Sequence, residues 1–197
     1  MSTIDVKSST AQGRSCGSCA LCCKLIGFAE INKPMGQWCP HCLKSNGCSI
    51  YNSRPKECRS FNCEWLTNAN FGDEWQPMRS KMVICHMRDG ETSKLVFHVD
   101  PGSPLSWRNE PYYSQLKRLA RNGLEHNGII TINIGKRVFV VLPNKDVDLG
   151  ICDVDDKVSI QKSWNGLDWE IKVHKESQDA PTKKDDAKSP LKNVLFS

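Results

Sequence analysis

The residues with the clearest potential for chemistry are nine cysteines that fall within one short part of the sequence. CxxC intervals occur three times, at 16–19, 19–22 and 39–42. Two residues between thiolates is the spacing at which a tight turn or one helical turn brings both sulfurs to the same metal ion. Two such pairs close a four-cysteine site, so the set is large enough for two sites with one thiol left over. The predicted metal ligands are Cys16, Cys19, Cys22, Cys23, Cys39, Cys42, Cys48, Cys58 and Cys63.

Cys22 and Cys23 are adjacent, which constrains how they take part. On a helix, at about 100° per residue, Cys16, Cys19 and Cys23 share one face and Cys22 points elsewhere. In a loop, neighbouring side chains diverge and would serve different metals, or one sulfur would bridge between them. Both geometries predict that Cys22 and Cys23 have different roles.

The expected cofactor is zinc or iron. Coordination by thiolates alone suits zinc(II), and it suits iron either as a single ion or in an iron–sulfur cluster. The opening run is similar to the CxxCxxC run of bacterial ferredoxins, but the fourth cysteine of that pattern is absent. His41 could replace a thiolate, although a turn residue between Cys39 and Cys42 is the favoured interpretation.

Eight thiolates around two divalent metals would carry about four excess negative charges, which cations or hydrogen-bond donors must compensate. Four basic residues next to the predicted ligands are candidates, and simple exposure on the surface explains them equally well: Lys24, Arg54, Lys56 and Arg59. The two cysteines outside the block are expected to be ordinary buried or loop thiols, and the four isolated histidines are expected to be structural: Cys85, Cys152, His86, His98, His126 and His174.

The block resembles the YkgJ-like cysteine-cluster family, which is described as a zinc- or iron-chelating domain with a CxxCxxCC motif. The matching segments are CGSCALCC at 16–23, WCPHC at 38–42, GCSIYNSRPKECRSF at 47–61, and Cys63. The resemblance implies metal binding through Cys16, Cys19, Cys22, Cys23, Cys48, Cys58 and Cys63, with Cys39 and Cys42 completing the set. Some relatives fuse this cluster to flagellin lysine methylation. This sequence shows neither the extra domain nor a glycine-rich nucleotide site, so methylation is not transferred.

The elements that must position these residues form an α+β protein: a loop-rich, metal-binding cysteine module followed by a small unit of antiparallel hairpins and a helix. The predicted divisions are a flexible arm at 1–14, the module at 15–75, an α+β unit packed on it at 76–174, and a disordered tail at 175–197. An Asp-Gly turn predicts a hairpin from 81–87 and 93–100, and Gly135-Lys136 predicts a second from 129–134 and 137–143. A helix is expected within 110–128, stopped by Gly123 or Gly128, and a third hairpin from 156–164 and 168–175.

Composition favours a soluble, cytoplasmic protein. The mean hydropathy is -0.49, no stretch approaches the roughly 18 apolar residues of a membrane span, and the first residues lack the apolar core of a secretory signal. Cytosolic thiols stay reduced, so eleven cysteines point to metal ligation before disulfides. The net charge of +5 is spread along the chain, which disfavours nucleic-acid binding. The expected partners are metal ions and a client protein, without a membrane.

Two functions compete at this point. One is a binding module in which structural zinc crosslinks a segment too poor in apolar residues to fold alone. The other is a redox or iron-handling iron–sulfur protein, or a component of a protein-modifying enzyme system. A metallothionein-like cluster is disfavoured by the aromatic residues around the ligands, and a thiol oxidoreductase by the lack of a βαβ context. No Ser/His/Asp set or phosphate-binding loop occurs, so no residue receives a catalytic role and enzyme activity is left open.

Overall fold

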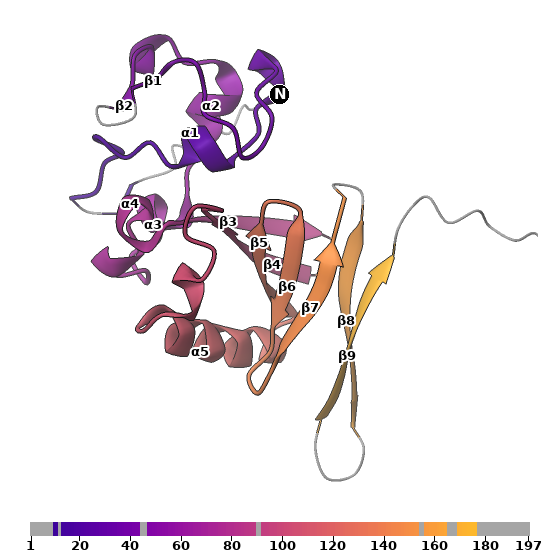
Figure 1. Ribbon diagram of the computed structural model, residues 1–197. Coiled ribbons are helices and arrows are strands. Elements are labelled where there is room, and N and C mark those ends of the chain that lie inside the picture. Colours follow the sequence, from indigo (N-terminus) through magenta and orange to yellow (C-terminus); the bar gives the residue numbers. More distant parts are fainter. Residues whose placement is uncertain are drawn as a thin grey trace, which may run out of the picture.

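A computed structural model describes residues 10–11, 13–43, 47–89, 92–153, 156–164 and 169–176. Most of the predicted arm and nearly all of the predicted tail lie outside these residues. The fold is α+β, as the sequence predicts. Its centre is a five-stranded sheet in the spatial order β3 (Met82–Asp89), β4 (Thr92–Val99), β5 (Gly128–Ile134), β6 (Arg137–Val141) and β7 (Asp146–Ile151) (Figure 1).

Strand pairing confirms the predicted hairpins. β3 pairs antiparallel with β4, with Met82 opposite Val99, and β5 pairs antiparallel with β6, with Ile134 opposite Arg137. The third hairpin consists of β8 (Lys157–Trp164) and β9 (Trp169–Glu176). Two features were not predicted: the parallel pairing of β4 with β5, and strand β7 itself. The β7 sequence DVDLGI contains two aspartates and a glycine and so lacks a continuous apolar run.

Helix α5 (Tyr112–Glu125) connects the parallel strands β4 and β5 and lies within the predicted range. Pro111 takes the N-cap position, because its missing N–H leaves no helical bond unmade there. Neither predicted glycine ends the helix: Gly123 lies inside it, and Gly128 opens β5. A Cβ atom on Gly128 would lie 2.9 Å from the Cα of Gly123, so the close approach of helix end and strand start depends on glycine.

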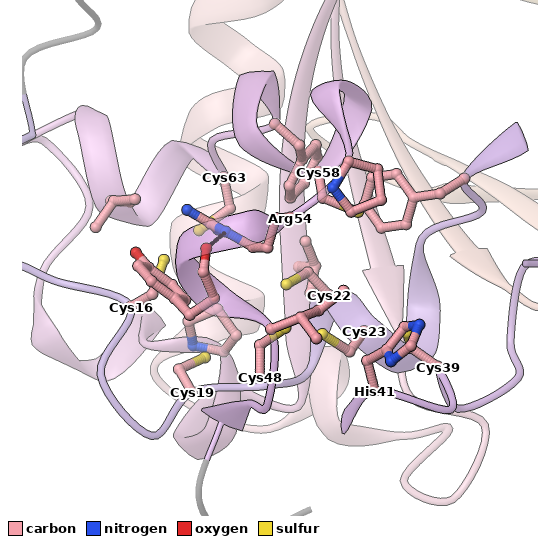
Figure 2. A pocket seen from close by; sticks show the side chains of 18 of the residues that line it. Cys16, Cys19, Cys22, Cys23, Cys39, His41, Cys48, Arg54, Cys58 and Cys63 are labelled. Atoms are coloured by element: carbon pink, nitrogen blue, oxygen red, sulfur yellow. Dashed lines mark hydrogen bonds between the residues drawn. The ribbon is translucent and has the colours of Figure 1, made fainter. Parts of the chain in front are cut away.

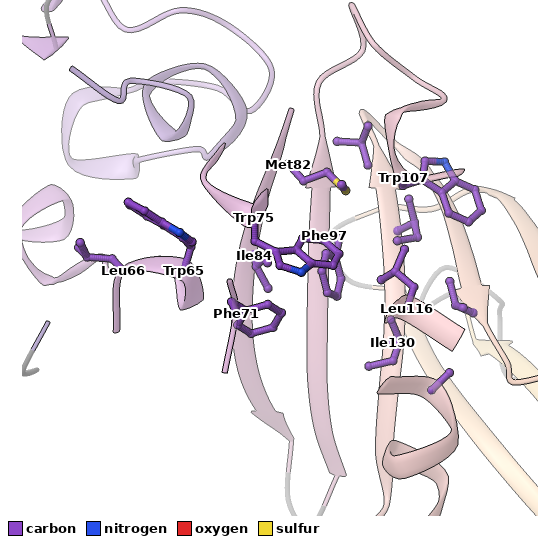
Figure 3. Packing of buried hydrophobic residues seen from close by; sticks show 14 residues of the cluster. Trp65, Leu66, Phe71, Trp75, Met82, Ile84, Phe97, Trp107, Leu116 and Ile130 are labelled. Atoms are coloured by element: carbon purple, nitrogen blue, oxygen red, sulfur yellow. The ribbon is translucent and has the colours of Figure 1, made fainter. Parts of the chain in front are cut away.

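The main core lies between α5 and one face of the sheet (Figure 3). Trp75, Phe97, Trp107 and Leu116 are almost completely buried there, and Trp75 packs against Phe97 with ring centroids 5.4 Å apart. Several residues from the end of the predicted 15–75 module belong to the same core: Trp65, Leu66, Phe71 and Trp75. Packing is therefore continuous across the compositional boundary at residue 75.

The opposite face of the sheet is covered by two different partners. Ile129, Val140 and Leu142 pack against the inner side chains of β8 and β9. At the other end of the sheet, Val83 packs with Leu21 and Leu25 from the cysteine-rich region. Because side chains alternate along a strand, β3 serves the main core with Met82 and Ile84 and the cysteine-rich region with Val83.

The N-terminal region is built from short pieces, as the loop-rich prediction requires (Figure 1). We call residues 16–63 the cysteine lobe. Its elements are α1 (Cys22–Leu25), η1 (Ala29–Ile31), β1 (Cys42–Leu43), β2 (Gly47–Cys48), η2 (Tyr51–Ser53) and α2 (Lys56–Ser60). The elements that lead from the lobe to the sheet are α3 (Glu64–Thr67), η3 (Asp73–Trp75) and α4 (Pro77–Ser80), and η4 (Ser106–Arg108) precedes α5.

The end of the predicted flexible arm is attached to the fold. The Ala11 N–H donates to the Leu66 carbonyl at 2.8 Å, and the Arg14 guanidinium donates to the carbonyls of Trp65, Asn68 and Phe71. Arg14 thereby satisfies carbonyl groups in and after the short helix α3, whose last carbonyls have no partner within the helix. Within the described residues, no helix combines the length and the apolar character needed to cross a membrane.

Candidate metal centre

The predicted ligands converge on one cavity of about 70 Å³ in the cysteine lobe (Figure 2). Eight of the nine line it: Cys16, Cys19, Cys22, Cys23, Cys39, Cys48, Cys58 and Cys63. The ninth, Cys42, hydrogen-bonds through its thiol to Cys23. Turns, short helices and a two-stranded ladder that are far apart in the sequence therefore bring the whole predicted set together. All of these cysteines are free thiols.

The first four cysteines do not form a single helix. The Cys19 N–H donates to the Cys16 carbonyl at 2.7 Å in a tight turn, and the helix α1 begins only at Cys22. Gly17 adopts φ +47° within this turn, a conformation that favours glycine. Cys22 and Cys23 are consecutive helical residues, so their side chains diverge by about 100°. Their roles in metal binding stay a prediction.

The CPHC turn is held directly against α1. The Cys39 N–H donates to the Cys23 carbonyl at 2.9 Å, and the Cys42 N–H donates to the Cys39 carbonyl at 3.0 Å. Cys42 then lies opposite Cys48 in the β1–β2 ladder. Gly47, at φ +82°, is where β2 meets the first turn: a Cβ atom there would lie 3.0 Å from the Gly17 carbonyl oxygen. A side chain at this position would push the two ligand-bearing segments apart.

We assign the thiols to two groups by their electrostatic neighbours. Cys16, Cys19, Cys22 and Cys63 form what we call the first cysteine group, and Cys23, Cys39, Cys42, Cys48 and Cys58 form the second cysteine group. Cys19 and Cys22 of the first group also interact with Cys23 of the second. Burial raises the pKa of Cys63 to about 11, and the thiols that add to this rise are Cys19 and Cys16. Burial also raises the pKa of Cys58, where the contributing thiols are Cys23, Cys39 and Cys48. In Figure 2, Cys16, Cys19 and Cys63 lie on one side of the cavity and Cys39 and Cys58 on the other.

Cys23 stands at the junction of the groups. The Cys22 thiol donates a hydrogen bond to the Cys23 sulfur, and the Cys42 thiol donates a second one. These bonds lower the pKa of Cys23, because they stabilise its thiolate. The bond to Cys23, together with burial, raises the pKa of Cys22. Cys22 thus favours the neutral thiol, whereas Cys23 favours the thiolate.

Backbone amides serve the first cysteine group. Burial raises the pKa of Cys19, but hydrogen bonds from the main-chain N–H groups of Leu21 and Met78 act in the opposite direction. The Leu66 N–H does the same for Cys63. Amide donors of this kind stabilise a thiolate and fix the direction of its sulfur. The amide donors therefore reduce the cost of deprotonating these buried sulfurs.

Cationic side chains serve the second cysteine group. Arg54 lines the cavity, and a 2.9 Å bond from its Nε to the Tyr51 carbonyl orients it (Figure 2). Its charge contributes to the lowered pKa of Cys23 and opposes the rise in the pKa of Cys58. Of the other predicted compensating cations, Lys24 pairs with Asp100 at 2.5 Å. The remaining two, Lys56 and Arg59, are exposed. A buried cation that the sequence analysis missed, Lys33, also acts on these thiols.

Other residues weighed from the sequence take varied positions. His41 lines the cavity, and its carbonyl accepts bonds from the Ser49 N–H and Oγ at 2.9 and 3.0 Å. Cys85, like Cys22 and Cys63, packs against the cluster of Leu21, Leu25 and Val83. Burial, with a smaller contribution from Cys63, raises the pKa of Cys85 to about 12. Strand alternation was the signal for this proximity, since residues 83 and 85 share a face. Cys152 is buried just after β7 and does not line the cavity.

No family model matches the chain, and neither the curated proteins nor the solved structures contain a match. Among the residues that the structure describes, no group of three or more His, Cys, Asp or Glu side chains is arranged to hold a metal ion as it stands. The chemistry of the donor set fits thiophilic metals, because its only abundant donor is sulfur and both groups have partners that stabilise thiolates.

Proposed function

We propose that this protein binds zinc or iron through its cysteine cluster, with one metal site in each cysteine group. The observation that carries the proposal is the convergence of eight cysteines on one cavity, with a ninth bonded to its central thiol. Thiols with pKa values of about 11 stay protonated at neutral pH, but a bound metal ion displaces those protons and stabilises the thiolates. The resemblance to a zinc- or iron-chelating family supports the same conclusion.

The residues of this chain would have distinct tasks in such a site. The first cysteine group would hold its metal with sulfurs oriented by main-chain amides. The second group would use Cys23 together with the thiols of Cys39, Cys48 and Cys58, with Arg54 offsetting part of their negative charge. A bound metal would supply crosslinks between segments that otherwise share few apolar contacts, and this favours a structural binding module.

A second candidate, a redox or iron-handling protein with an iron–sulfur cluster, is favoured by the position of Cys23. Its sulfur accepts bonds from a thiol of each group, so the two groups are linked through sulfur. The cavity is also bordered by apolar side chains, including Phe28, Ile31 and Phe61. Burial and hydrogen bonds to sulfur are the factors that tune the reduction potential of such clusters.

Anaerobic purification, elemental analysis and a visible spectrum test the proposal. We expect about two metal ions per chain, since eight thiolates enclose two tetrahedral ions. A colourless zinc protein supports the structural module, whereas a brown protein with sulfide supports the iron–sulfur candidate. Cys19→Ser in the first group and Cys48→Ser in the second should each lower the metal content and the stability. Cys152→Ser is the matched control and should change neither, and equal metal content in all three variants would contradict the ligand assignment.

A further inference from the structure

Lys33 is buried, which is rare for a lysine. Only 5% of its surface is exposed. A short turn returns the chain to α1: the main-chain groups of Phe28 and Lys33 exchange two hydrogen bonds of 2.9 Å, and Asn32 takes φ +49° between them. The turn places the Lys33 side chain beneath the C-terminal end of α1, the helix that carries Cys22 and Cys23.

The partners of the Lys33 ammonium are all neutral. It donates to the carbonyls of Lys24 at 3.3 Å and Pro34 at 3.2 Å, and to the carbonyl of Ile26. Within the described part of the chain, no carboxylate forms an ion pair with it. Withdrawing an ammonium from water costs several kcal/mol unless an anion compensates. Hydrogen bonds to carbonyls satisfy its N–H groups but leave its net charge uncompensated.

The groups near Lys33 that can become negatively charged are thiols, once they lose their protons. Burial lowers its pKa, and the charges that oppose this shift are those of Cys23, Cys39, Cys22 and Cys58. Three of these belong to the second cysteine group. A divalent ion with four thiolates has a net charge of about −2. Lys33 and Arg54 together supply two positive charges to that group, whereas the first group is served by amides.

We propose that Lys33 is the fixed counter-charge of the second cysteine group and a positioning residue for its metal ion, an inference that rests on the proposed metal binding. Its ammonium stabilises the thiolate form of that group and, through the carbonyls it bonds, holds the end of α1 in place. Lys24 provides the contrast. It lies next to Cys23, but its charge is neutralised by Asp100.

The test measures metal retention against graded chelator in Lys33→Met, which keeps most of the aliphatic stem and removes the charge. We expect the affinity of the second group to fall about 10- to 100-fold, the range found when partners of metal ligands are removed. Lys33→Arg keeps the charge and should stay within about threefold of the wild type, as should the matched control Lys24→Met. Loss of metal in Lys33→Arg equal to that in Lys33→Met would assign the effect to geometry and overturn the proposal.

Combining Lys33→Met with a second substitution shows whether it weakens metal binding in the second cysteine group alone or in both groups. In Cys63→Ser, which disables the first group, Lys33→Met should remove most of the remaining metal. In Cys58→Ser, which disables the second, the same change should have no further effect, and circular dichroism should confirm an intact sheet in both. Equal losses in the two backgrounds would contradict the role of Lys33. A wild-type chain that retains no metal would instead contradict the proposed function itself.

Discussion

The cysteine lobe and the sheet unit are stabilised by different physical means. The sheet unit has long strands, a 14-residue helix, and an interior in which Trp75, Phe97 and Leu116 are 0 to 1% exposed. The lobe has helices and strands of two to five residues. Its apolar cluster consists of Leu21 and Leu25 together with Val83 from the sheet. Apolar burial is extensive in the first region and small in the second, which we propose is stabilised by bound metal.

A similar contrast exists inside the lobe. The first cysteine group lies against the sheet and receives main-chain N–H donors, which cannot be lost by substituting a side chain. Four cysteines of the second group lie on α1, β1, β2 and α2, and the charges that act on this group come from the side chains of Lys33 and Arg54. The second group should therefore depend more on side chains than the first, and mutations can test this difference directly.

Metal removal should produce the largest difference between the two regions. A structural zinc site contributes on the order of 10 kcal/mol to folding. We expect chelation to unfold residues 16–63 and to leave the sheet folded. Hydrogen exchange would then show loss of protection at the Cys39 and Cys42 amides, both bonded within the lobe, and retention at the amides of β4. Persistent protection of the lobe amides after chelation would show that packing alone holds the lobe.

A substitution in the main core should have the opposite effect to metal removal: it should destabilise the sheet unit and leave metal binding unchanged. Phe97 is fully buried and packs against Phe71 and Trp75. Phe97→Ala should lower the free energy of unfolding by about 3 to 5 kcal/mol, because it leaves a cavity in the main core. Urea unfolding measures this loss, and elemental analysis should find the metal content unchanged. If metal content fell in parallel, the two regions would be more tightly coupled than their separate means of stabilisation indicate.

Acidification should reveal a smaller effect inside the sheet. Burial lowers the pKa of His98 on β4 to about 4 from an ordinary value of 6.5. The unfolded chain therefore takes up a proton below about pH 6.5, while the folded one stays neutral, so stability present above that pH is lost as the pH falls towards 4. The total is about 3 kcal/mol.

The difference between wild type and His98→Leu isolates this contribution. Urea unfolding at about pH 7 and about pH 4.5 should show a steeper loss of stability in the wild type, because only the wild type has this imidazole to protonate. Metal release in acid affects both proteins and cancels in the comparison. Identical pH dependence in the two proteins would mean that His98 is protonated without cost.

Local signals in the sequence predict the elements of the sheet unit except β7, and they miss what depends on tertiary structure. Turn residues identify the hairpins, and helical spacing identifies α5. The parallel pairing of β4 with β5 is set by packing through α5, and no local residue pattern encodes it. The same holds in the lobe. CxxC spacing and the density of cysteines identify the nine that come together, but their assignment to two groups depends on contacts between distant turns, such as that of Gly47 with Gly17.

Lys33 illustrates the same limit. It is ten residues after Cys23 and six before Cys39, so proximity in sequence pointed instead to Lys24, whose charge the structure pairs with Asp100. Only the short turn from Phe28 to Lys33 brings the buried lysine back to the helix that carries the cysteines. Charge compensation was predictable as a requirement, but the residue that provides it was not.

The placement of Trp65 bears on how such a protein can be rearranged. Its side chain borders the cysteine cavity and also belongs to the main core, together with Leu66, Phe71 and Trp75. The cysteine cavity and the main core therefore have a side chain in common, whereas two independent domains would be joined by a linker. Moving residues 15–75 into another protein would remove four side chains from the main core of this one. Recombination at this boundary would leave neither product with a complete interior.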